Sequence, residues 1–239
     1  MDGGTGELKI IYLKRPGWWL AAALAVLLVL CLAITLWWTP AAPATAEADS
    51  LAGKVLLIDP GHGGFDPGAV ADDGTHEDAV NLAISLKLAQ ALRDRGGTVI
   101  MTRMTEGALA GTKREDMDRR LKLIKSSGAD LVISIHMNHF GVGRYRGAQI
   151  FYRTGDEESK LLAELIQENI RAKVDPSNTR QCKYSQNYGV LNFAKAPAVL
   201  AECGFLSNPE ETSNLKDPDY QSRLAQAIAE AAGRFFQEQ

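Results

Sequence analysis

An apolar run that stops at a histidine-containing turn constrains most strongly how this chain can fold. Val55 to Ile58 are consecutive apolar residues, which predicts a strand buried on both faces, and Asp59-Pro60-Gly61 ends it. His62 follows immediately. Ligands of open α/β sheets bind at the carboxyl ends of the strands, and glycines there let the backbone turn tightly. By itself, D-P-G-H-G-G is also compatible with an ordinary glycine-rich surface turn.

Strands and helices are predicted to alternate after this first strand. The expected strands are 98–102, 131–135, 148–152 and 198–201, with a short strand or turn at 189–193. The expected helices run from a Thr75–Asp78 capping box to about 93, and over 113–127, 158–174 and 218–236. In the helix at 113–127, Met117, Leu121 and Ile124 should face inward. The alternation predicts one three-layer α/β domain, with a mostly parallel twisted sheet flanked by helices.

An uncharged segment precedes this domain. Residues 18–38 contain no charged side chain and, as a helix, would span roughly 30 Å of hydrocarbon. Tryptophan pairs at both ends are typical of membrane interfaces. Lys9, Lys14 and Arg15 precede the segment, whereas the first charged residues after it are Glu47 and Asp49. We therefore expect a single transmembrane helix that leaves the following domain outside the cytoplasm. The alternative for such a segment is a buried core helix.

The expected organisation has four parts: a cytoplasmic N-terminus at 1–17, a transmembrane signal-anchor at 18–38, a linker at 39–53 and a catalytic domain at 54–239. A cleaved signal peptide is the alternative to the anchor, because Ala44-Thr45-Ala46 has the small-residue pattern of a cleavage site. The domain would then be secreted. The apolar run is longer than that of a usual signal peptide, which favours an uncleaved anchor that spans the cytoplasmic membrane once.

Composition limits the kinds of partner that the chain can bind, and cysteine spacing limits its possible disulfides. The chain is 46% hydrophobic and 23% charged, as globular proteins are, and its net charge of −3 without a basic stripe argues against nucleic acid. Cys31 lies in the apolar segment, and Cys182 and Cys203 have no disulfide-framework spacing. We expect the latter two to be reduced and independent. In an oxidising compartment the alternative is a disulfide between them.

Two of the four histidines, His62 and His136, directly follow predicted apolar strands. The carboxyl ends of parallel strands meet at one rim, so the two imidazoles can converge. Two imidazoles and one carboxylate with a fourth position open hold a catalytic Zn²⁺. Glu77, which opens the next helix, is the expected carboxylate, although an acid in a first helical turn can simply stabilise the helix dipole. His76 and His139 are the competing ligands, one beside Glu77 and the other farther into its loop.

Glu202 ends the last predicted core strand, where burying an ionised carboxylate is costly without a partner or a task. A water activated by a metal needs a base, and a departing amine needs an acid. One carboxyl group can serve both needs in turn, so we expect Glu202 to be catalytic. The alternative is a structural ion pair with an arginine such as Arg120.

Five sequence segments carry a resemblance to a known family. They are I-D-P-G-H-G-G at 58–64, E-D-A-V-N-L at 77–82, T-R at 102–103, R-L-K-L-I-K-S-S-G-A-D-L-V-I-S-I-H-M-N at 120–138 and A-V-L-A-E-C-G-F-L-S-N-P-E-E at 198–211. With these segments the chain resembles the zinc-dependent N-acetylmuramoyl-L-alanine amidases of bacterial cell walls, the amidase 3 family. The resemblance runs from about residue 54 to 236.

This resemblance implies zinc ligation by His62, Glu77 and His136, and catalysis by Glu202. It implies hydrolysis of the amide between the lactyl group of N-acetylmuramic acid and L-alanine in peptidoglycan, with Glu202 taking a proton from a zinc-activated water and giving it to the amine. The chain departs from the family at Asp78, where Lys is common. The loops look too short for the helical plug of some members, so we expect an open site or regulation by a separate protein.

The anchor, the lack of wall-binding repeats and Asn178-Thr179-Arg180 resemble the branch that acts on spore cortex. In that branch, removal of the stem peptide precedes the action of a muramic acid deacetylase and formation of muramic lactam, which matters for germination. Two other functions stay open. One is a membrane-tethered, non-catalytic protein that binds peptidoglycan or acts as a scaffold. The other is a zinc peptidase acting on the stem peptide itself.

Overall fold

The structure, a computed structural model, describes residues 17–37, 50–141 and 143–239. The chain divides into two compact units, Met1–Ala44 and Thr45–Gln239, and each is described by itself. In the first unit, α1 is a helix at Trp18–Trp37. Within the described residues, none of the helices combines the length and the apolar character that a membrane crossing requires. Residues 1–16 of the predicted cytoplasmic segment, residue 38 of the predicted anchor and residues 39–49 of the predicted linker lie outside the described residues.

A mixed six-stranded sheet forms the centre of the second unit. In chain order its strands are β1 (Val55–Pro60), β2 (Thr98–Met101), β3 (Leu131–Asn138), β4 (Gln149–Arg153), β5 (Lys183–Ser185) and β6 (Ala198–Phe205). The spatial order is β2-β1-β3-β6-β4-β5. The strands β2, β1, β3 and β6 are parallel to one another, β4 is antiparallel to β6, and β5 is parallel to β4. The carboxyl ends of β1, β3 and β6 therefore meet at one edge.

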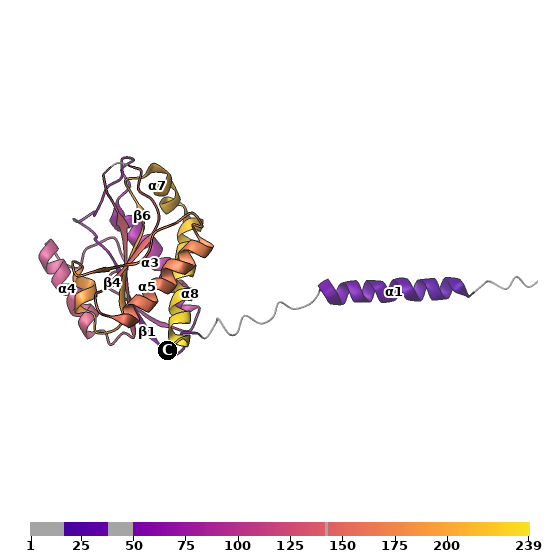
Figure 1. The fold of residues 1–239 in the computed structure, drawn as a ribbon. Coiled ribbons are helices and arrows are strands. Elements are labelled where there is room, and N and C mark those ends of the chain that lie inside the picture. The colour runs from indigo at the N-terminus through magenta and orange to yellow at the C-terminus, as the bar shows by residue number, and fades with distance from the viewer. Residues whose placement is uncertain (1–16, 38–49, 142) are drawn as a thin grey trace, which may run out of the picture. The chain divides into compact units, whose positions relative to one another are not determined.

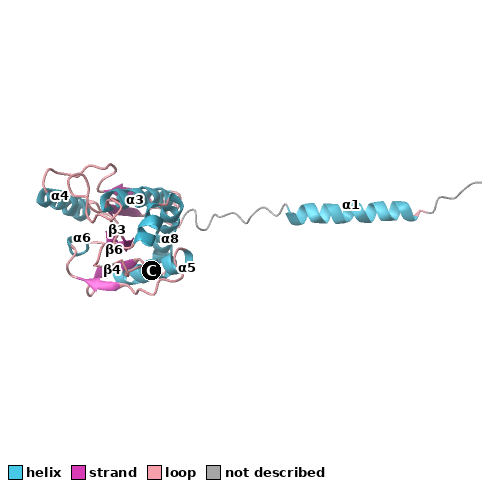
Figure 2. Ribbon diagram, turned by 90° about the horizontal axis from the view of Figure 1, so that it is seen from above, coloured by secondary structure: helices cyan, strands magenta, loops and turns pink. Residues whose placement is uncertain are grey.

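Helices cover both faces of this sheet (Figures 1 and 2). They are α3 (Glu77–Arg93), α4 (Lys113–Ser126), α5 (Glu157–Lys173), α6 (Gly189–Phe193), α7 (Pro209–Lys216) and α8 (Pro218–Gln237). In Figure 2, α3, α5 and α8 lie on one side of the strands, and α4 and α6 on the other. Two apolar clusters fill the layers between them: the larger includes Leu88, Ile166 and Ile228, and the smaller includes Ile124 and Leu191. The predicted three-layer α/β domain is confirmed.

The folded unit includes the last residues before β1. Leu51 is fully buried in the larger cluster, and its N–H donates to the carbonyl of Arg95 at 2.9 Å. Ordered packing therefore begins ahead of residue 54, the start of the predicted domain.

Several local predictions are wrong. The helix α6 occupies residues 189–193, where a short strand or turn was expected, because periodicity cannot distinguish strand from helix in so short an apolar run. His76, whose side chain makes no capping hydrogen bond, is the N-cap of α3 in place of Thr75. Met117 is 40% exposed, whereas α4 buries Asp116 and Arg120 along with Ile124. Two short elements were not predicted from the sequence: the strand β5, and the helix α7, which Asn208 caps.

Candidate active site

His62 lies in the turn after β1 with a strained backbone. Its φ of 60° makes it the one non-glycine residue with positive φ among those described. Its Nδ1 lies 2.9 Å from a carboxylate oxygen of Asp66. A carboxylate only accepts hydrogen bonds, so Nδ1 donates its proton to Asp66, and Nε2 is the ring nitrogen left to meet Glu77 or a metal ion. That Nε2 faces Oε1 of Glu77 at 3.3 Å.

Glu77 is the first residue of α3 and is only 4% exposed. Its two oxygens accept hydrogen bonds from the backbone N–H groups of Ala69, at 2.9 Å, and Met137, at 3.1 Å. Burial alone would raise the pKa of Glu77, but hydrogen bonds and charge from His136 and His62 lower it well below its usual value. The carboxylate is therefore ionised and rigidly held.

His136 lies within β3, which runs past the predicted end of the strand to Asn138. Its Nδ1 is 3.0 Å from Oε1 of Glu77, and its ring is 5.1 Å from that of His62, edge to face. One ligand atom from each of the three side chains lies within 4.8 Å of the other two. The structure thus brings together the three residues that the sequence predicted as a group.

Two glycines leave the space that these side chains occupy. A Cβ at Gly61 would lie 2.2 Å from Cε1 of His136, so the imidazole is packed directly against the backbone of the turn. A Cβ at Gly68, whose φ is 68°, would lie 2.6 Å from Oε2 of Glu77. Two imidazole nitrogens and one carboxylate oxygen are the donors that catalytic zinc sites use. The residues present therefore fit a zinc ion, and Asp66 supplies the outer hydrogen bond that a metal-bound histidine usually makes.

Glu202 lies beside His136, because these two residues are direct partners in the pairing of β3 with β6. It is 8% exposed, and its buried Oε2 has no hydrogen-bond partner among the residues that the structure describes. Burial raises the pKa of Glu202 to about 7, helped by the charge of Glu77, while the two histidines and the Tyr188 hydroxyl act in the opposite direction. A buried carboxyl oxygen without a partner is rare, and such groups occur at catalytic positions.

Comparison with known proteins identifies the family. The family model described as N-acetylmuramoyl-L-alanine amidase matches residues 56–234. The chain belongs to this family. Its activity is that of an N-acetylmuramoyl-L-alanine amidase, a peptidoglycan hydrolase.

Curated relatives and solved structures support the same family. The amidase is 38% identical to the germination-specific N-acetylmuramoyl-L-alanine amidase of Bacillus subtilis over 196 aligned residues. The alignment covers 79% of this chain and 82% of that protein. It superposes on the CwlD amidase from Clostridioides difficile, solved in complex with the GerS lipoprotein, with a TM-score of 0.76. That match has 38% identity and covers 78% of this chain and all of the other. An N-acetylmuramoyl-L-alanine amidase from Clostridium difficile 630 gives a TM-score of 0.71 at 29% identity, covering 78% and 98%.

A buried ionic network supports the turn that carries His62 in this amidase. Asp59, at the end of β1, accepts hydrogen bonds from Thr102 at 2.6 Å, from Arg120 at 2.9 Å and from Ser134 at 2.9 Å. The guanidinium of Arg120 also donates to the backbone carbonyl of His62. Despite burial, which acts in the opposite direction, Arg120 and these hydroxyls lower the pKa of Asp59. The role of Asp59 was not predicted from the sequence, although a carboxylate directly following a fully buried strand was a signal for it.

The structure excludes the alternative ion pair between Glu202 and Arg120. The two carboxylates that pair with Arg120 are Asp59 and Asp116. Asp66 was also missed, and its signal was a carboxylate four residues after His62 in a glycine-rich loop.

The competing histidines lie apart from His62, Glu77 and His136, here called the metal-ligand group. The side chain of His76 is 54% exposed and lies 3.9 Å from Asp78, and His139 is exposed. Among the described residues, His62, Glu77 and His136 make up the one group of His, Cys, Asp and Glu placed to hold a metal ion. Cys182 and Cys203 are both unpaired, as expected.

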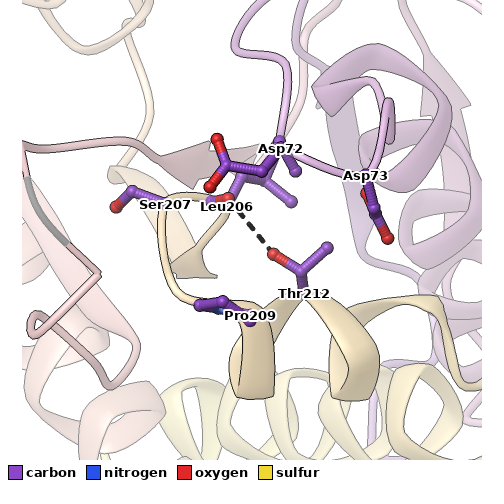
Figure 3. A pocket seen from close by; sticks show the side chains of 7 residues that line it. Asp72, Asp73, Leu206, Ser207, Pro209 and Thr212 are labelled. Atoms are coloured by element: carbon purple, nitrogen blue, oxygen red, sulfur yellow. Dashed lines mark hydrogen bonds between the residues drawn. The ribbon is translucent and has the colours of Figure 1, made fainter.

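A small pocket lies between the loop after β1 and the turn that joins β6 to α7 (Figure 3). Its volume is about 90 Å³, and Thr212 closes one side by donating a hydrogen bond to the carbonyl of Leu206 at 3.2 Å. None of its lining residues belongs to the metal-ligand group or is Glu202: Ala71, Asp72, Asp73, Leu206, Ser207, Pro209 and Thr212. The pocket is therefore separate from the candidate active site.

Proposed function

We propose that this amidase is zinc-dependent, with His62, Glu77 and His136 as the metal ligands and Glu202 as the residue that moves the proton. The observation that carries this proposal is the convergence of two imidazoles on a buried, ionised carboxylate beside a carboxyl oxygen that has no protein partner. The bond cleaved joins the lactyl group of N-acetylmuramic acid to L-alanine.

Neighbouring groups orient the proposed ligands before any ion binds. Asp66 fixes the proton of His62 on Nδ1, which leaves Nε2 for the metal. The backbone N–H groups of Ala69 and Met137 hold the carboxylate of Glu77 in place. When bound, zinc supplies Lewis acidity that lowers the pKa of a water molecule and polarises the scissile carbonyl. A rigid ligand set lowers the cost of ordering the site for this chemistry.

Glu202 is placed to act first as a base and then as an acid. Its Oε2 is buried and makes no hydrogen bond to the protein, so it is available to accept the proton of the attacking water. The same oxygen then delivers that proton to the nitrogen of L-alanine as the amide bond breaks. A carboxyl group whose pKa lies near 7 can do both at neutral pH. The products are a glycan strand with free lactyl carboxylates and a peptide with a free L-alanine amine.

Digestion of purified peptidoglycan tests this proposal. The wild-type chain, with and without a chelator, should be compared with Glu202→Gln and His62→Ala variants, with zinc content measured in parallel. We expect chelator-sensitive release of peptides beginning with L-alanine, release slowed roughly 100-fold or more in both variants, and loss of zinc only from His62→Ala. Release that persists after zinc removal would contradict the metal assignment. New ends within the stem peptide, identified by mass spectrometry, would indicate a zinc peptidase, and binding without cleavage a scaffold protein.

We also propose that the protein acts on spore cortex from a membrane anchor. Similarity to a germination-specific amidase supports the cortex, and the uncharged segment at 18–38 supports the anchor. Removal of stem peptides would then provide the substrate of a muramic acid deacetylase. The related CwlD amidase was solved with a lipoprotein, which supports a separate protein regulator for this chain as well.

The muramic lactam content of spores and the fractionation of membranes test these further proposals. Spores that lack the protein should contain no muramic lactam, and normal lactam content would contradict the cortex assignment. The intact protein should stay in the membrane fraction after alkaline carbonate extraction. A soluble form beginning at Glu47 would instead show cleavage of a signal peptide. Activity that is unchanged by any co-purified protein would argue against the regulator.

A further inference from the structure

Three side chains stand in a row across the sheet on the face that carries the active site. In the strand register, His136 of β3 is the direct partner of Glu202 of β6, and Glu202 is in turn the partner of Gln149 of β4. Directly opposed residues on neighbouring strands point to the same face. The side chain of Arg180 follows next, because its Nη1 donates to Oε1 of Gln149 at 3.1 Å. Arg180 therefore extends the row by one position beyond Gln149, which places it two positions from Glu202.

The guanidinium of Arg180 is fixed in place by its neighbours. The backbone N–H of Arg180 donates to Oδ1 of Asn178 at 2.9 Å, and its carbonyl accepts from Arg171 at 2.7 Å. In the side chain, Nε donates to the carbonyl of Arg146 at 2.7 Å, and the guanidinium carbon lies 4.4 Å from the ring centroid of Phe205. Binding a ligand here would cost little side-chain entropy, because the side chain is already ordered.

Neutral groups are the partners of this positive charge. The described part of the chain offers Arg180 a backbone carbonyl, the Gln149 amide and the Phe205 ring, and none of these carries a negative charge. By contrast, the buried Arg120 has two carboxylate partners. The bonds above use Nε and Nη1, which leaves Nη2 to donate to a ligand. Arginine side chains held on an aromatic ring in this way bind carboxylates strongly.

The stem peptide carries a carboxylate at a suitable distance. Its second residue is a glutamate joined through its side-chain carboxyl, so its α-carboxylate is free. Two extended residues span at most about 7 Å, which places that carboxylate roughly 6 to 7 Å from the nitrogen released by hydrolysis. Neighbouring strands are about 4.8 Å apart, so the Arg180 side chain, two positions from Glu202 in the row, lies roughly 10 Å from it. The remaining difference of roughly 3 Å is the length of one hydrogen bond between the guanidinium and that carboxylate.

We propose that Arg180 binds the free α-carboxylate of the second stem-peptide residue and thereby makes the amidase selective for peptides in which this group is not amidated. The proposal rests on the amidase function argued above. Arg180 is a binding residue in it and takes no part in proton transfer.

Two muropeptides that differ only in a carboxylate or a carboxamide at the second residue test the proposal. The full-length, zinc-loaded wild-type chain should cleave the carboxylate form with a kcat/KM roughly 10- to 100-fold higher, the range that hydrogen bonds between charged groups give, mainly through KM. Arg180→Gln should lose this preference and cleave the two forms with similar kcat/KM. Arg180→Lys should keep part of it, because lysine retains the charge without the planar fork.

Lys183→Gln is the matched control, because Lys183 is exposed on β5 close in sequence to Arg180 and its replacement removes the same charge. It should keep the wild-type preference. A wild-type enzyme that cleaves both substrates equally well, or an Arg180→Gln enzyme that keeps the full preference, would overturn the proposed subsite. If the wild-type chain released no peptide from either substrate, the proposed function itself would fail. Thermal unfolding of each variant shows whether it has kept its fold. If Arg180→Gln does not fold, the substrate preferences of the wild type and of Arg180→Lys still test the proposal.

Discussion

Substitution of Gly61 by alanine tests whether the metal site depends on backbone space as well as on its ligands. The added Cβ would lie 2.2 Å from Cε1 and 2.4 Å from Nε2 of His136, whereas ordinary contacts begin at 3.4 Å. The imidazole must therefore move by about 1.2 Å, the difference between 3.4 and 2.2 Å, or the turn must open. Metal–ligand distances tolerate only about 0.2 Å, and a 1 Å misplacement at an active site can cost about 100-fold in rate.

We accordingly expect Gly61→Ala to bind zinc at least 10-fold more weakly, as changes around metal ligands typically cost about 10- to 100-fold in affinity, and to lose about 100-fold in kcat/KM. Zinc affinity can be measured by competition with a chromophoric chelator, and activity by release of L-alanine-terminated peptides. Gly111→Ala is the control, because a Cβ there meets nothing within 4 Å and the backbone does not have positive φ. Wild-type zinc affinity and activity in a correctly folded Gly61→Ala protein would refute the reasoning.

Three further predictions concern buried groups. Glu202→Gln should keep zinc and fold but lose roughly 100- to 10,000-fold in turnover, and peptide release near the wild-type rate would contradict its assigned role. Asp59→Asn should cost about 3 kcal/mol in urea unfolding at pH 7 by breaking the buried pair with Arg120. Because the folded-state pKa of Asp59 is lowered, its stabilisation is complete above the unfolded pKa of about 3.9 and is lost as the pH falls through the folded pKa, so the two proteins should converge in acid. A thiol reagent should label Cys182 in the native protein but Cys203, which is fully buried, only after unfolding; a disulfide between them would block both.

The sequence was sufficient to predict the metal-ligand group because strand ends carry unusually clear local signals. His62 and His136 come after apolar runs, and parallel strands bring such positions to one edge. The detailed strand bounds did not matter for this result. His136 lies inside β3 and Glu202 inside β6, yet both still face the same side, because their register as direct partners is set by the pairing of the two strands.

Side-chain pairing over long distances could not be predicted in the same way. Arg120 was a candidate partner for Glu202, but α4 directs its guanidinium to the end of β1, where Asp59 and the carbonyl of His62 lie. The sequence pattern also placed Met117 inside, because periodicity assumes that apolar residues face the core. In α4 the buried positions instead hold Asp116 and Arg120, whose charges satisfy one another and Asp59. Only the three-dimensional structure shows which charges are paired.

The residues that the sequence analysis overlooked explain how His62 can keep a strained conformation. A positive φ at a residue with a Cβ costs on the order of 1 kcal/mol or more, and it persists only where surrounding contacts enforce it. Arg120 supplies such a contact through the carbonyl of His62, and Asp59 holds Arg120 in place. The ion pair therefore stabilises the fold and positions His62, a proposed metal ligand, through the same bonds. Asp59→Asn should consequently weaken zinc binding along with stability, although Asp59 is not among the ligands, because the backbone of the turn is what orients the His62 ring.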